Sequence, residues 1–64
     1  MTKNDLSILT VNDIQEIMGL GRDRAYRLMH SDGFPAVLVG RTAFVTVENF
    51  MKWMDDYTYK KFEI

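Results

Sequence analysis

The stretch LTVNDIQEIMGLGRDRAYRLMH, residues 9–30, decides the fold because it contains two short helical patterns separated by a turn with glycine. Thr10 is a good N-cap for a helix over residues 10–18, and Asp13 three positions later suits a weak capping box. Apolar residues at i, i+3 and i+4 give this helix one stripe, which consists of Ile14, Ile17 and Met18. Gly19 follows the last apolar position, where many helices end in a left-handed residue.

A second helix is predicted over residues 22–30, directly after the short connection Leu20-Gly21. Its buried stripe has the same spacing and consists of Ala25, Leu28 and Met29. At about 100° per residue the opposite face carries Asp23, Arg27 and His30, and the flanks carry Tyr26, Arg22 and Arg24. Two short helices with this turn predict a helix-turn-helix, in which the first helix braces the second and the second enters the DNA major groove.

The residues after the helix pair predict a β-hairpin. Strands are expected over residues 36–39 and 42–46, with Gly40-Arg41 as the turn between them. Pro35 keeps Phe34 extended before the first strand. A two-stranded hairpin alone is barely stable in water, so this one is expected to pack on the helices.

Thr46 is placed to cap a third helix over about residues 47–57. The side chains expected to face the core are Val47, Phe50, Met51, Met54 and Tyr57, with Trp53 at the edge of the stripe. The tail from residue 58 to 64 either extends this helix or frays, and Lys60 and Lys61 either stay solvated or contact phosphate. The whole pattern predicts a mainly α fold with a small β-hairpin, a winged helix-turn-helix. Residues 1–64 are expected to form a single domain with its core at about 9–57.

The composition argues against an enzyme or a metalloprotein. The chain has no cysteine and one histidine, so neither a disulfide nor a metal cluster is expected, and no cofactor is predicted. Asp55 and Asp56 are adjacent and point about 100° apart on a helix, while Asp23 and His30 lie too far apart along one helix for a direct hydrogen bond. No apolar run approaches the roughly 20 residues of a membrane span, and the amino terminus lacks a secretory stretch. We therefore expect a cytoplasmic protein without catalytic activity.

The charge is unevenly distributed along a chain whose net charge is −1. All four arginines lie within residues 22–41, where only two acids accompany them, which gives this window +2. The remaining residues hold four lysines and seven acids, which gives −3. One side of the molecule is therefore expected to be basic, although a chance cluster on a solvated face is the alternative.

The residues expected to contact DNA lie on the second helix and in the hairpin: Gly21, Arg22, Asp23, Arg24, Tyr26, Arg27, His30, Arg41 and Thr42. Arginine suits both phosphate and guanine because its planar fork offers two parallel donors. Tyrosine donates to phosphate or packs on sugar, aspartate accepts from cytosine, and free amides at the helix start suit a phosphate. Arg41 at the tip of the hairpin reaches a minor groove or flanking phosphates, or else it is a solvated turn residue.

Two ordered stretches, LTVNDIQEIMGLGRDRAYRLMHSDGFPAVLVGR and TVENFMKWM, resemble the excisionase and phage-regulator (AlpA-like) proteins, which are related to the winged domain of MerR-type activators. The resemblance covers roughly residues 9–54. It implies a sequence-specific DNA-binding protein of a phage, prophage or plasmid that regulates transcription or bends attachment-site DNA for an integrase. The positions that match the family's DNA-contacting residues are Arg22, Tyr26, Arg27 and Arg41. Gly21 departs from the family, which has a small hydroxyl residue there.

The partners expected from this interpretation are double-stranded DNA and an integrase or recombinase. Cooperative binding by two or more copies is also expected, because one module of this size buries only about 600–1,000 Å² on DNA. An alternative interpretation keeps the fold but makes it a protein-interaction module. The hairpin is unusually apolar, and Phe44 and Val45, if exposed, would bind a phage or host regulator.

Overall fold

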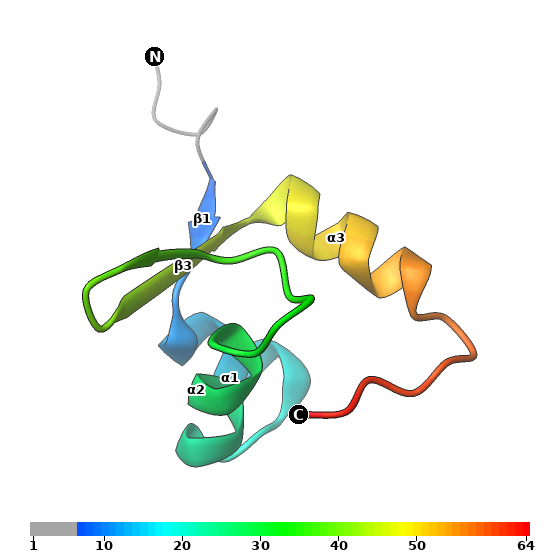
Figure 1. Ribbon diagram of the computed structural model, residues 1–64, viewed down its shortest axis with the longest axis horizontal. Helices are drawn as coiled ribbons and strands as arrows, with labels where there is room; N and C mark the ends of the chain where they lie inside the picture. The colour runs from blue at the N-terminus through cyan, green and yellow to red at the C-terminus, as the bar shows by residue number, and fades with distance from the viewer. Residues whose placement is uncertain (1–6) are drawn as a thin grey trace.

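The computed structural model of the protein describes residues 7–64, and within them three helices pack against a small antiparallel sheet (Figure 1). The elements, in chain order, are β1 (Ile8–Leu9), α1 (Val11–Met18), α2 (Arg22–Met29), β2 (Val37–Val39), β3 (Thr42–Thr46) and α3 (Val47–Asp56). The helix pair, the β2–β3 hairpin and the closing helix are the winged helix-turn-helix that the sequence predicts.

Both ends of α1 form as predicted. The Asp13 amide donates to Thr10 Oγ1 at 3.4 Å, and the Thr10 amide donates to Asp13 Oδ2 at 2.9 Å, which completes a capping box. Gly19 adopts a left-handed conformation with φ of 68°, which a residue with a side chain adopts only at a cost. The chain can therefore turn sharply after α1 and lead through Leu20 into α2.

Strand β3 lies at the centre of the sheet, with β1 and β2 on either side of it. The short strand β1 was not predicted; Leu9 pairs with Val45 in β3. Directly paired residues point to the same face of a sheet, so Leu9 and Val45 lie on one face. That face packs on the helices, since Val45 is fully buried and Leu9 contacts the core. The opposite face carries Ile8, Phe44 and Val37.

The core of residues 7–64 contains apolar side chains only. Its buried members are Ile14, Ala25, Leu28, Met29, Phe34, Ala43, Val45, Phe50 and Trp53. The predicted stripe of α2 is confirmed in full. Val45, however, is 0% exposed, so the expectation that it lies on the surface of the hairpin is wrong.

Three side chains show the opposite difference: they were predicted to face the core but lie at the surface. Ile17 is 55% exposed because the buried face of α1 is centred on Val11, Ile14 and Met18 and leaves Ile17 at its margin. On α3, Met51 and Met54 are 61% and 44% exposed, whereas Trp53 is only 7% exposed. The reason lies beneath the helix: the Phe34 ring lies 4.8 Å from the Trp53 ring, and this edge-to-face contact turns the Trp53 side of α3 inward.

The carboxy-terminal tail neither extends α3 nor frays. It turns back at Tyr59, which has φ of 68°, and it returns toward the helix pair (Figure 1). Phe62 packs edge-on against Trp53 and Tyr57, with ring centroids 5.2 Å and 5.0 Å apart. The tail is therefore attached to the aromatic part of the core. No helix within the described residues is long and apolar enough to cross a membrane.

Candidate nucleic-acid interface

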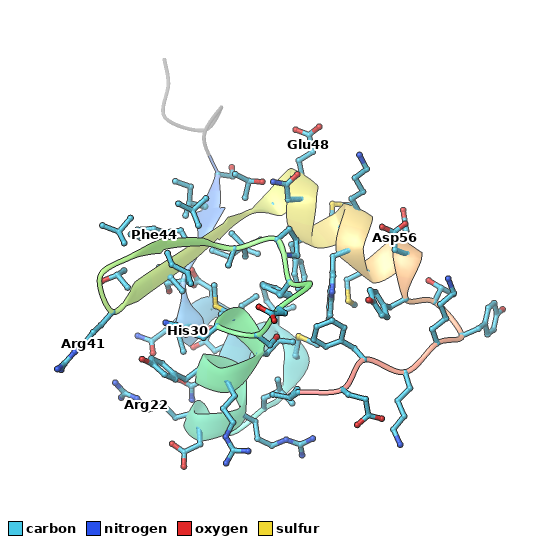
Figure 2. The ribbon with its side chains drawn as sticks, in the orientation of Figure 1. Arg22, His30, Arg41, Phe44, Glu48 and Asp56 are labelled. Carbon is cyan, nitrogen blue, oxygen red and sulfur yellow. The ribbon has the colours of Figure 1, made fainter. Side chains whose placement is uncertain are left out.

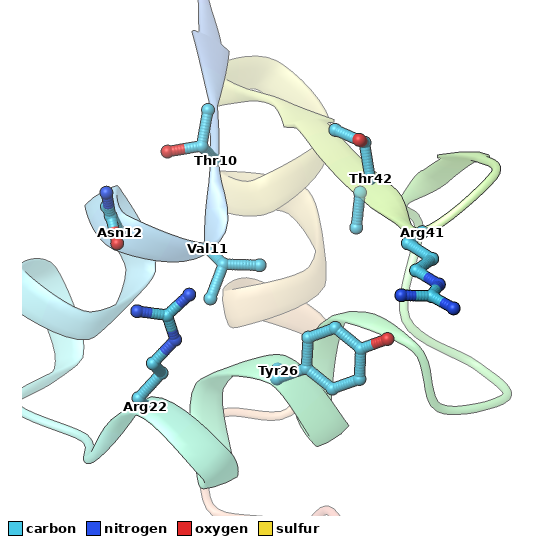
Figure 3. A pocket seen from close by; sticks show the side chains of 8 residues that line it. Thr10, Val11, Asn12, Arg22, Tyr26, Arg41 and Thr42 are labelled. Carbon is cyan, nitrogen blue, oxygen red and sulfur yellow. The ribbon is translucent and has the colours of Figure 1, made fainter.

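The helix pair and the hairpin meet around an open hollow of about 270 Å³ (Figure 3). Arg22 and Tyr26 come from α2, Arg41 comes from the turn of the β2–β3 hairpin, and Thr42 is the first residue of β3. Thr10, Val11 and Asn12 at the start of α1 and Ala43 of β3 complete the lining of the hollow. In Figure 3 the Tyr26 ring lies between the guanidinium groups of Arg22 and Arg41. Four of the predicted DNA-contacting residues are thus brought together from two distant parts of the chain.

The guanidinium groups at this hollow are free to bind an anion. Arg22 and Arg41 are both exposed, and neither forms an ion pair with another residue of the range 7–64. Figure 2 shows the two arginines projecting from one side of the molecule, while Glu48 and Asp56 project from α3 on the other. This separation agrees with the uneven charge in the sequence. A basic hollow between a helix and a hairpin suits a phosphate chain that passes between them.

Tyr26 is held in place by His30. The two rings stack with centroids 4.0 Å apart at an interplanar angle of 27°, and His30 Nδ1 lies 2.9 Å from the backbone carbonyl oxygen of Tyr26. His30 Nε2 is buried. His30 lies outside the buried stripe of α2, as predicted, but its ring does not extend freely into solvent, because it folds back along the end of the helix onto Tyr26. Its position makes it a support for Tyr26.

The other two arginines of α2 lie away from this hollow, Arg24 on the opposite flank of the helix and Arg27 on its outward face. Arg24 and Arg27 border a second hollow of about 280 Å³, whose remaining wall is the tail segment 61–64. This neighbourhood could not be predicted from the residue pattern, because it depends on the tail folding back through Phe62. Asp23 and Gly21 are exposed at the start of α2.

Sequence reasoning did not anticipate that the start of α1 borders the first hollow. Thr10 and Asn12 border the first hollow, although neither was among the predicted contact residues. In a helix-turn-helix the first helix crosses the DNA backbone while the second enters the groove, and this rule could have drawn attention to the polar first turn of α1. Gly21 has no side chain that could accept from the first-turn amides of α2, whereas Thr10 caps the start of α1.

The chain belongs to the helix-turn-helix domain family, whose model matches residues 8–57. Neither the curated proteins nor the solved structures yielded a match to this chain. Helix-turn-helix domains bind DNA and are typically not enzymes. Family and fold together therefore indicate a DNA-binding regulator.

Proposed function

We propose that this protein is a sequence-specific DNA-binding protein of a phage or other mobile element, of the AlpA-like and MerR-related kind. It acts as an excisionase or as a transcriptional regulator. The observation that carries the proposal is the hollow at which Arg22 and Tyr26 of α2 meet Arg41 and Thr42 of the hairpin. A DNA backbone that crosses this hollow has the major groove on the α2 side and the next minor groove on the hairpin side.

Each contact residue has a distinct role in this proposal. Arg22 and Arg41 bind phosphates from two sides, and Tyr26, held by its stack on His30, donates its hydroxyl to the same strand. Asp23 and Arg27 face away from the buried stripe of α2 and read base edges in the major groove. In this proposal residues 1–64 form one DNA-binding domain, and the protein acts in the cytoplasm. Two or more copies bind DNA cooperatively. As an excisionase, the protein works together with an integrase.

A second candidate function is a protein-interaction module. The observation that favours it is the hairpin surface, where Val37, Leu38 and Val39 are 59%, 52% and 61% exposed. Contiguous exposed apolar side chains are typical of interaction sites. In this case a phage or host regulator binds the hairpin, and the arginines of α2 contribute nothing.

The two candidates differ in their response to salt and to loss of arginine. We would titrate the protein into labelled duplexes tiled across the neighbourhood of its own gene and follow fluorescence anisotropy at two salt concentrations. DNA binding predicts affinity that falls steeply with salt, because each phosphate contact releases counterions. Arg41→Gln should weaken binding and reduce the slope of log K against log salt by about 1.

Lys52→Gln is the matched control, since Lys52 is an exposed cation on α3 away from the hollow. It should leave both the affinity and the slope nearly unchanged. Absence of binding at low salt, or an equal loss for Lys52→Gln and Arg41→Gln, would contradict the proposal. Binding sites beside an attachment site or integrase gene favour excision, and sites within a promoter favour regulation of transcription.

A further inference from the structure

Strand β2 is a short free edge of the sheet that carries no charged side chain, proline or bulge. The strand order β1-β3-β2 leaves one side of β2 unpaired within the described residues. Edge strands of soluble proteins normally carry a lysine, a proline, a bulge or an inward charge that prevents pairing with another chain. Val37, Leu38 and Val39 provide none of these, and each is more than half exposed, at 59%, 52% and 61%.

The hairpin geometry determines which backbone groups point outward from this edge. Val39 pairs with Thr42 across the two-residue turn, and the next pairs are Leu38 with Ala43 and Val37 with Phe44. Pairs that exchange hydrogen bonds alternate with pairs that do not, and the pair that closes a two-residue turn exchanges them. The amide and carbonyl of Leu38 therefore point away from β3, toward the free side of the sheet.

The edge is also complementary to itself. A second copy that approaches antiparallel with its two-fold axis at Leu38 places Leu38 opposite Leu38, and the two residues exchange both hydrogen bonds. Val37 of each copy then lies beside Val39 of the other, a pairing of β-branched side chains on one face. Both valines share the outer sheet face with Phe44 and Thr42 through their own partners in β3.

We propose that β2 is a self-association edge through which two copies of this chain pair antiparallel about Leu38 when DNA brings them together. The pairing involves three residues of each copy, whereas stable protein interfaces bury roughly 20–30 residues on each side. The contact is therefore too small to hold a dimer in dilute solution. Two copies on neighbouring DNA sites have a much higher effective concentration, at which a weak contact is sufficient.

A two-fold contact also predicts the arrangement of the DNA sites. Symmetric pairs of proteins bind half-sites that are inverted repeats, whereas a head-to-tail contact would select direct repeats. This part of the inference rests on the proposed function, but the pairing itself can be tested without DNA.

The first test uses the absence of cysteine from the chain. In the proposed register the two Leu38 Cα atoms lie about 5.5 Å apart, which is within disulfide range. The two Val39 Cα atoms lie about 8 Å apart, which is beyond it. Under mild oxidation of concentrated protein, Leu38→Cys should form disulfide-linked dimers many times faster than Val39→Cys. Met51→Cys, at an equally exposed site on α3, measures the collisional background.

Equal dimer formation by the three cysteine variants would overturn the proposal, as would faster dimer formation by Val39→Cys. Circular dichroism establishes that each variant is folded. If Leu38→Cys does not fold, Val39→Lys serves as the second variant and Met51→Lys as its charge-matched control. On duplexes that the protein selects from random sequence, Val39→Lys should abolish cooperative occupancy of paired sites and retain binding to single sites, while Met51→Lys retains both.

The duplex-selection experiment distinguishes a failure of this inference from a failure of the proposed function. Selected duplexes with inverted repeats support the two-fold edge, and direct repeats or non-cooperative single sites overturn it while the DNA-binding function stands. Recovery of no duplex at all overturns the proposed function, and the cysteine comparison then decides the pairing on its own.

Discussion

Replacing Phe62 with alanine tests whether the carboxy-terminal tail belongs to the folded core. Phe62 is half-buried and makes edge-to-face contacts with Trp53 and Tyr57 at 5.2 Å and 5.0 Å. Truncation of a fully buried phenylalanine to alanine costs about 3–5 kcal/mol, and each aromatic pair contributes about 0.5–1.5 kcal/mol of its own. For a half-buried ring with two such pairs we expect a loss of about 2 kcal/mol in the free energy of unfolding.

For a chain of this size, a loss of about 2 kcal/mol corresponds to a fall in Tm of roughly 8–16 °C. Thermal unfolding followed by circular dichroism measures it. The fluorescence of Trp53, the single tryptophan, reports the opening of its surroundings. Tyr59→Ala is the control, because Tyr59 lies in the same tail but is 103% exposed, and it should change stability by less than about 0.5 kcal/mol. If Phe62→Ala and Tyr59→Ala melt at the same temperature, the tail does not contribute to the core.

Three further substitutions test local features by the same unfolding measurements. Thr10→Ala removes the side-chain half of the capping box of α1 and should cost about 1 kcal/mol; an unchanged Tm would show that the cap contributes nothing. Gly19→Ala should cost about 1–2 kcal/mol through its φ of 68° alone, since nothing lies within 4 Å of the added Cβ, so a neutral result would refute the left-handed conformation. Tyr59→Gly should stabilise the chain by up to about 1 kcal/mol because it relieves a φ of 68°, whereas a loss of stability would show that Tyr59 contributes a contact.

Sequence periodicity and capping residues predicted the three helices and the hairpin because each of these features is local. The caps Thr10 and Thr46 are short polar side chains that bind amides three residues later in the chain. The two-residue turn at Gly40-Arg41 likewise depends on nearby residues, with Gly40 at φ of 61°. Such features can be predicted without knowledge of the tertiary fold.

The features that the sequence did not predict depend on distant parts of the chain. Strand β1 has two residues, and only its pairing with β3 makes it a strand. The stripe of α3 is wide enough to bury either Met51 and Met54 or Trp53, and the position of Phe34 decides for Trp53. The neighbours of the predicted DNA-contacting residues could not be predicted for the same reason, because they come from segments that are distant in the sequence. Their roles in DNA binding stay predictions.

The junction at Thr46 determines where the chain can tolerate a change of length. Thr46 is the last residue of β3, the partner of Ile8 in β1 and the cap whose hydroxyl accepts from the Asn49 amide at 3.1 Å. A residue inserted between Thr46 and Val47 would either separate the Thr46 hydroxyl from the Asn49 amide or, if the cap were kept, shift β3 by one residue and turn Val45 to the outer face. No residue of the turn at Gly40-Arg41 both pairs in a strand and caps a helix. Length variation among relatives of this chain should therefore collect at the tip of the hairpin and be absent from the β3–α3 junction.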